Sequence, residues 1–437
     1  MNRICLCLPT NRACAATLTA IHAEAAYAAE HFGADVQLLV LDSSDAHTRA
    51  EHARVMAGLR RVAGVTVHHL DESEQRTFLR RTIEYARLSD PDRLLHLMLP
   101  PAVSYGACTN RAFLLAAALG CASLHRRDSD SAYQLHAGQP VFPVHHELPH
   151  LGRPALEATA TVTRTDLAPE LLHRPVSLAG ASFIGELSVD IGEIRRLDEG
   201  VHHDVVSLWA PGDWPEDRKR DLVEESFTGA GTAPFTADRA TLTVVDPMRV
   251  DMCNVAFDRA VYERIPLPPA TDTIGSDYFL LHLVHGAGLP GILHNRHIEN
   301  FHTPERRTDT GFPAYQRRFV KFLLSMLYFH HVYDRMAAEG AGLLDERHQV
   351  RAEAVTAFLR ESTALDRAEN IWRLDRVDTA YRKLGGRYAT FADQLAVDRG
   401  RLLNKAQSDI EDCAHLVEAW PALVGAAAAL GLGDGRP

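Results

Sequence analysis

Ile4-Cys5-Leu6-Cys7-Leu8-Pro9 begins the chain as an apolar run of strand length. Such a run is typical of a buried strand, and its two alternating cysteines are most simply part of a core. The pattern then repeats along the chain, with helical stretches and further apolar runs at residues 13–32 (helix), 36–41 (strand), 65–70 (strand), 72–88 (helix) and 94–99 (strand). This alternation predicts an α/β fold with a mostly parallel sheet and helices on both faces.

The loops after the predicted strands carry polar residues that are candidates for ligand binding. In a parallel sheet, ligands bind beyond the carboxyl ends of the strands. Pro9, Thr10 and Arg12 follow the first strand, and Asp42 follows the second. We therefore expect these loops to meet at one edge of the sheet. Asp42 also has a structural alternative, because the sequence Asp-Ser-Ser-Asp is well suited to capping the next helix.

The segment from Ser104 to Ser131 contains the most informative pattern. Gly106 is expected to mark a loop before an alanine-rich helix, Gly120 to end that helix, and a short strand to lead to Asp128 and Asp130. Two carboxylates one residue apart on a turn can hold a hard divalent cation, and that cation can neutralise a departing diphosphate. The alternative is an ordinary solvated turn, because Asp and Ser favour turns for backbone reasons.

The order of these features resembles GT-A glycosyltransferases, in which an alanine-rich helix bearing Asn or Arg leads into a strand that ends in Asp-x-Asp. The resemblance covers roughly residues 3–135 and 250–305. It implies a nucleotide-diphosphate sugar as donor, bound by Pro9, Thr10, Arg12, Asp42, Asn110, Arg111, Arg127 and Asp128.

One departure from the family pattern concerns the strand before the first aspartate. That strand is usually apolar, whereas here His125-Arg126-Arg127 intervene. These cations either bind phosphate or pair with the carboxylates.

The second part of the resemblance lies near residues 274–302. Asp277 begins a helix with an apolar face at residues 279–284, and a predicted strand at residues 292–301 ends in His302. The resemblance implies that Asp277 acts as the base toward the acceptor. It also implies that His302 completes a site for Mn2+ or Mg2+ with Asp128 and Asp130. The structural alternatives are a helix-capping aspartate and a surface histidine.

The chain divides into regions of different character. We expect a catalytic domain at residues 1–310, a helical domain at residues 311–429 that is a possible surface for homo-oligomer formation, and a disordered tail at residues 430–437. Within the first, residues 153–245 are predicted to be an insertion or acceptor-shaping region, with a strand at 185–190 and a charged helix at 215–227.

Composition, charge and residue spacing disfavour several classes of protein. The formal net charge of -11 over 437 residues disfavours a nucleic-acid binder. Seven cysteines without paired C-x-x-C motifs, and no apolar run of about 18 residues, favour a cytoplasmic protein without a transmembrane segment or signal peptide. Histidine pairs such as His145-His146 lack the spacing of metal ligands.

We therefore predict a metal-dependent glycosyltransferase that acts on a soluble small-molecule acceptor, in keeping with an alanine- and arginine-rich bacterial composition and a role in secondary metabolism. Two alternatives stay open. A nucleotidyltransferase or other group transferase is disfavoured, because residues 9–13 lack the glycines of a phosphate-binding loop. The other alternative is a catalytically silent binding protein on the same scaffold.

Overall fold

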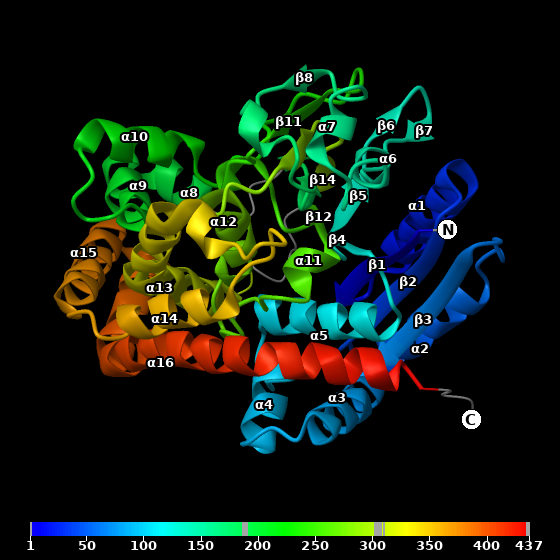
Figure 1. Cartoon of the computed structure of the whole chain (residues 1–437). Helices are drawn as coiled ribbons and strands as arrows, with labels where there is room; N and C mark the ends of the chain where they lie inside the picture. The colour runs from blue at the N-terminus through cyan, green and yellow to red at the C-terminus, as the bar shows by residue number, and fades with distance from the viewer. Residues whose placement is uncertain (1, 186–190, 301–307, 309–310, 434–437) are drawn as a thin grey trace.

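The computed structural model describes residues 2–185, 191–300, 308 and 311–433. It has a nine-stranded mixed sheet with helices packed on both faces and a helical C-terminal part (Figure 1). The predicted fold class is confirmed in that the architecture is α/β, with a large, mostly parallel sheet flanked by helices and a helical C-terminal part.

The strands of the main sheet are arranged so that the first four in space are parallel, whereas β12 runs antiparallel to both of its neighbours, β4 and β9. In spatial order they are β3 (Val65–Asp71), β2 (Asp35–Asp42), β1 (Arg3–Thr10), β4 (Ser123–Arg127), β12 (Asn254–Asp258), β9 (Leu178–Gly180), β13 (Gly291–His294), β11 (Ala240–Thr243) and β8 (Arg164–Thr165). Two small sheets contain β10 (Phe183–Gly185), β14 (Ile298–Asn300) and β5 (Ser131–Tyr133), and β6 (Leu135–His136) and β7 (Gln139–Pro140).

The alternation of side chains along β1 builds a core on each face of the sheet. Ile4, Leu6 and Leu8 belong to one core, and Cys5 and Cys7 belong to the other. The helices of the first core include α1 (Ala15–Phe32), with α2 (Ala46–Ala57) and α6 (Val144–Glu147) packed on α1. Those of the second core include α3 (Glu72–Ala86), α4 (Pro91–Met98) and α5 (Tyr105–Ala118).

Three elements differ from the sequence prediction. Residues 94–99 do not form a strand, because Pro91 begins α4 there, and a helix buries the leucines of this apolar run just as well. Gly106 lies inside α5 rather than in a loop, and Ser104 caps that helix by accepting a hydrogen bond from the backbone N–H of Ala107. The single strand expected at residues 292–301 is divided into β13 and β14, as far as the described residues extend.

Residues 153–245 belong partly to the main sheet, since they supply β8, β9 and β11. The same region contains the helical elements α7 (Ala155–Ala158), η1 (Pro169–Leu171), α8 (Gly192–Leu197), α9 (Glu199–Val206), η2 (Ser207–Trp209) and α10 (Glu216–Glu225). The predicted charged helix is thus present as α10. The strand predicted at residues 185–190 lies mostly outside the described residues.

The remaining helical elements lie after β11 and include the whole C-terminal helical part of the chain. They are η3 (Pro247–Arg249), α11 (Arg259–Tyr262), η4 (Ser276–Tyr278), α12 (Phe279–Gly286), α13 (Gly311–Glu339), η6 (Gly340–Leu343), α14 (Ala352–Ser362), α15 (Ala368–Leu384) and α16 (Gly386–Leu430). The last helix runs alongside α5 (Figure 1), and Trp420 donates a hydrogen bond to the carbonyl of Tyr262 at 2.9 Å. The helical region therefore packs directly on the helices that cover the sheet.

One helix, α16, is long and apolar enough to cross a membrane by length and composition. However, 56% of its most apolar window is buried inside the protein, as expected for a helix of the core. The tail predicted to be disordered comprises residues 430–437. The structure describes residues 430–433 of it, and residues 434–437 lie outside the described part of the chain.

Gly106 provides a test of this packing. A Cβ atom at this position would lie 1.9 Å from the carbonyl oxygen of Pro268, so Gly106→Ala should destabilise the protein by about 1–3 kcal/mol through overpacking. Gly400, inside α16, is a matched control because a Cβ atom there meets nothing within 4 Å. Gly400→Ala should stabilise the protein by about 0.5–1 kcal/mol. Urea unfolding measures both changes, and equal effects would contradict the close approach.

Candidate functional site

A cavity of about 410 Å3 opens at the carboxyl ends of β1, β2 and β4. Its walls include the loop after β1, the loop after β4 and the first turn of η4. Three parts of the chain predicted from sequence to belong to the site, the loop after β1, the Asp-x-Asp turn and the segment of Asp277, thus meet in one place. The topology explains this, because parallel neighbouring strands end at the same edge of the sheet.

The end of β1 contributes Pro9 and Thr10 to the cavity wall, and the loop after it contributes Arg12. Arg12 forms an ion pair with Asp130 at 3.1 Å, and this pair joins the loop after β1 to the loop after β4. The predicted donor-binding loop and the predicted metal-binding loop are therefore in direct contact.

Asp128 and Asp130 both line the cavity directly after the last residue of β4. Enclosure in the cavity raises the pKa of Asp128 to about 6; Arg126 opposes this shift, whereas the neighbouring carboxylates Asp130, Asp251 and Asp277 add to it. A carboxylate whose neighbours are mostly other carboxylates lies in a field that favours binding of a cation. The oxygen donors and the excess of negative charge fit a hard divalent cation such as Mn2+ or Mg2+.

Arg126 lies at the centre of this acidic group. Its guanidinium is 3.1 Å from Asp128 and 3.3 Å from Asp277, and it also donates to the carbonyl of Met252 at 2.9 Å. The side chain is only 3% exposed, so its charge needs these partners. One buried cation thus joins the Asp-x-Asp turn to the residue predicted to be the catalytic base.

Asp277 does not act as a helix cap. It lies within η4, Gly275 occupies the capping position with a φ of 73°, and the Asp277 carboxylate contacts Arg126 instead of the helix end. Burial raises the pKa of Asp277, and Arg126 opposes that shift. A raised pKa makes a carboxylate a better proton acceptor.

Sequence reasoning missed Asp251 and Tyr278. Asp251 lies in the turn before β12 and lines the same cavity, and it accepts a hydrogen bond of 2.6 Å from the Tyr278 hydroxyl. The only signal available in the sequence was an acidic residue close to a strand. Because β12 is antiparallel to β4, the amino end of β12 meets the carboxyl end of β4, and that pairing is not visible in the sequence.

Arg127 does not reach the cavity, although it was predicted to contact the donor. Its side chain is 2% exposed and forms ion pairs with Glu24 and Glu147 at 2.8 Å and 2.9 Å. Alternate side chains of a strand point to opposite faces, so Arg126 and Arg127 cannot both face the donor.

Asp42 is also removed from the cavity. Its carboxylate is fully buried and lies 2.8 Å from both His52 and His69. Burial would raise the pKa of Asp42, but hydrogen bonds from the two histidines and Ser44 hold it well below its usual value. Asp42 does not cap the next helix, because Asp45 caps α2.

The two polar residues of α5 have structural partners. Asn110 is fully buried and exchanges hydrogen bonds of 2.7 Å and 2.8 Å with the backbone of Leu267. Arg111 lines the cavity but donates to Gln75 and to the carbonyl of Met98, both at 2.7 Å. Of this pair, only Arg111 is placed where it could meet a donor. His302 lies outside the described residues.

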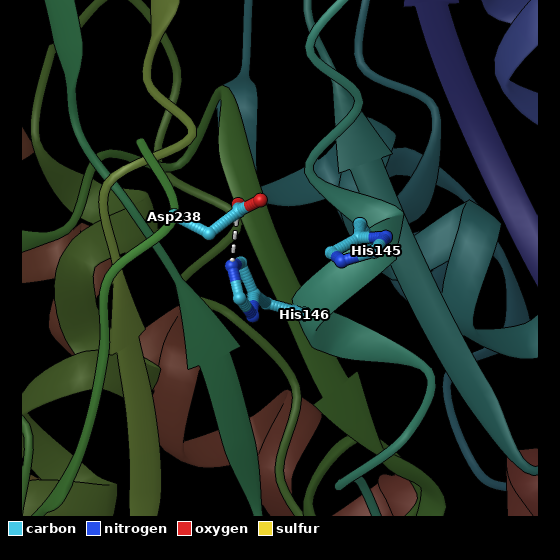
Figure 2. A group of neighbouring side chains, drawn as sticks. All are labelled: His145, His146 and Asp238. Atoms are coloured by element: carbon cyan, nitrogen blue, oxygen red, sulfur yellow. Dashed lines mark hydrogen bonds and ion pairs between the residues drawn. The ribbon is translucent and has the colours of Figure 1, made fainter. Parts of the chain in front are cut away.

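A second group of metal-ligand types lies apart from the cavity. His145, His146 and Asp238 have ligand atoms within 4.8 Å of one another, the only such trio among the residues that the structure describes. Figure 2 shows His146 facing Asp238, which comes from another segment, and His145 on the same helical turn as His146. However, Arg296 already binds both oxygens of Asp238, at 2.6 Å and 2.9 Å. A metal ion would have to displace that guanidinium, so we assign none here.

The buried pair of Arg127 and Glu147 predicts a loss of stability in acid. Burial alone would raise the pKa of Glu147, but Arg127 and His125 outweigh burial and lower it from 4.5 to about 2. Ionised Glu147 therefore stabilises the fold above about pH 4.5, and this contribution is lost as the pH falls toward 2.

Glu147→Gln should lower the free energy of unfolding by about 3 kcal/mol near neutral pH, and the difference from the parent should shrink in acid. Urea unfolding from about pH 7 to about pH 3 measures this. Glu30→Gln is the control, since Glu30 forms an exposed pair with Arg60 and its loss should matter little. A difference that does not change with pH would show that the ionisation of Glu147 is unimportant.

Comparison with known proteins adds the following. The model of a family of unknown function, DUF6271, matches residues 2–435. No curated protein matches the chain. Among solved structures, the chain is similar to the mannosyltransferase PcManGT from Pyrobaculum calidifontis, in complex with GDP-Man and Mn2+. The identity is 13% and the TM-score 0.38, over 99% of this chain and 88% of that one. A likeness of this degree does not extend the activity of that enzyme to this chain.

Proposed function

We propose an activity for this chain, which belongs to the family of unknown function DUF6271: it transfers a sugar from a nucleotide-diphosphate sugar to a small-molecule acceptor, with the help of a divalent metal ion. The observation that carries the proposal is the meeting of the Asp-x-Asp turn, the loop after β1 and Asp277 around Arg126 in one cavity.

The residues that would hold the metal are Asp128 and Asp130, together with His302 as the family resemblance implies. When bound, the metal supplies Lewis-acid stabilisation of the leaving diphosphate. The chain itself supplies Arg12 beside Asp130, so that the loop after β1 brings a further positive charge to the same edge. A donor diphosphate needs such cations.

Asp277 is the proposed proton acceptor. Its burial supports the role, because a desolvated carboxylate holds a proton more readily than an exposed one. Arg126 is a positioning residue, since it contacts both Asp277 and Asp128. The acceptor would bind where its hydroxyl or amine comes within hydrogen-bond distance of Asp277.

The metal assignment is tested by replacing Asp130 with Asn. The parent should gain melting temperature when Mn2+ and the matching nucleotide sugar are added together, because ligands that bind the folded state stabilise it. Asp130→Asn should lose this gain and keep the melting temperature of the free protein, since Asp130 lies on a turn outside the core.

Asp238→Asn is the matched control, because it removes the carboxylate of the other group of metal-ligand types. It should keep the gain. If Asp238→Asn loses the gain in melting temperature and Asp130→Asn keeps it, the metal binds at the group of Asp238 and our assignment to Asp130 is wrong. No gain with any of a panel of nucleotide sugars would argue for a different ligand altogether.

Asp277→Asn tests the proposed base. Asn keeps the shape of the side chain but removes the proton acceptor, so transfer should slow by about a hundredfold or more while donor binding is retained. Asp45→Asn is the control, since Asp45 caps α2 away from the cavity and caps tolerate Asn. Sugar transfer is measured with purified protein under saturating donor. Near-parental turnover of Asp277→Asn would exclude Asp277 as the base.

A further inference from the structure

The end of the cavity beyond Asp277 is lined by aromatic rings. Trp209, Phe227 and Phe322 contact one another, with ring centroids 5.2 Å, 5.5 Å and 6.5 Å apart. These residues come from η2, the turn after α10 and α13, which are far apart in the sequence. Three separate elements thus bring flat apolar surfaces to one wall.

The backbone has unusual features at two positions beside these rings, Phe227 and Gly275. Phe227 has a φ of 64°, a conformation that a bulky residue rarely adopts and that persists only where its surroundings enforce it. Gly275, just before Ser276 and Asp277, lies against the ring of Phe322, because a Cβ atom there would be 2.6 Å from that ring. The aromatic wall is therefore in direct contact with the segment that carries the proposed base.

Further aromatic rings line the cavity. Tyr333 stacks on His282 with ring centroids 3.8 Å apart, and both line the cavity beside Tyr278. A molecule at this end of the cavity would lie among rings on more than one side. A pair of aromatic rings gains free energy beyond the burial of its area, so this surface favours a ligand that itself carries an aromatic ring.

The charges at this end exclude an anionic ligand. Asp251, Asp277 and Glu225 line the cavity, whereas the arginines among its described lining residues are Arg12, Arg111 and Arg126. Arg111 and Arg126 are already bound to oxygens of the protein, and Arg12 beside Asp130 is the cation left to the donor diphosphate. An acceptor that carries phosphate would therefore meet carboxylates without a cation of its own.

We propose that the acceptor is a planar aromatic molecule, neutral or cationic, with a hydroxyl or amine directed at Asp277; this rests on the sugar transfer proposed above. In the reaction, the acceptor oxygen or nitrogen forms a bond to the anomeric carbon. The bond from that carbon to the diphosphate oxygen breaks, and its electron pair leaves with the diphosphate. The acceptor proton passes to Asp277. Asp277 and the aromatic rings line the same cavity as the residues proposed to hold the donor and metal, so the acceptor would lie next to the donor.

The test uses 2-naphthol as a probe, without donor or metal, in equilibrium dialysis against the full chain. The parent protein should bind 2-naphthol more tightly than 2-naphthyl phosphate, which has the same rings and a negative charge. Trp209→Leu and Phe227→Gly should each weaken binding of 2-naphthol by about threefold to tenfold, the usual effect of losing an aromatic contact. Phe227→Gly should fold even if Trp209→Leu does not, because glycine favours a φ of 64°.

The matched control is Tyr85→Leu, which removes an aromatic ring that is 58% exposed on α3 and leaves the cavity intact. It should bind 2-naphthol as the parent does. The proposal is overturned if the phosphate ester binds as tightly as 2-naphthol, or if Phe227→Gly binds 2-naphthol like the parent. Because donor and metal are absent, these outcomes are independent of whether a nucleotide sugar binds, which the melting-temperature experiment decides.

Discussion

The structure depends on two adjacent buried arginines at the end of β4. A strand directs consecutive side chains to opposite faces, so Arg126 and Arg127 need separate sets of carboxylates, one on each side of the sheet. A buried guanidinium without such partners would be strongly destabilising. Arg127 is paired with Glu24 and Glu147 on the face covered by α1 and α6, and Arg126 with Asp128 and Asp277 on the other.

The two pairings have different consequences because the first is enclosed in the core and the second lines a cavity. Around Arg127 the charges lie within the protein core, where Glu147 also contacts His125 and Glu24 accepts from Tyr133, so this group joins α1, β4 and α6. Around Arg126 the carboxylates line a cavity and outnumber the guanidinium, with Asp130 and Asp251 nearby. The first group holds elements together, and the second is suited to binding a cation and to accepting a proton.

The region at residues 153–245 connects this polar centre with an apolar end. It supplies strands to the main sheet, and it also supplies Trp209 and Phe227 to the cavity wall. Together with α13, it turns one side of the cavity into an aromatic surface beside the carboxylates. Its composition had suggested only a region that shapes the acceptor site, and the rings could not be assigned to a common wall because their elements meet only in the folded chain.

The sequence by itself determined the strands at the start of the chain, the position of the Asp-x-Asp turn after β4 and the presence of Asp277 at the start of a helical segment. Those features follow from the local periodicity of apolar residues and from turn chemistry. Tertiary structure alone decided that Arg127, Asp42 and Asn110 are held in the core and that Asp251 lies at the cavity. Arg127 and Glu24 are separated by 103 residues, and Arg126 and Asp277 by 151. The partner of a buried charge is set by which elements pack together, and local periodicity carries no information about that.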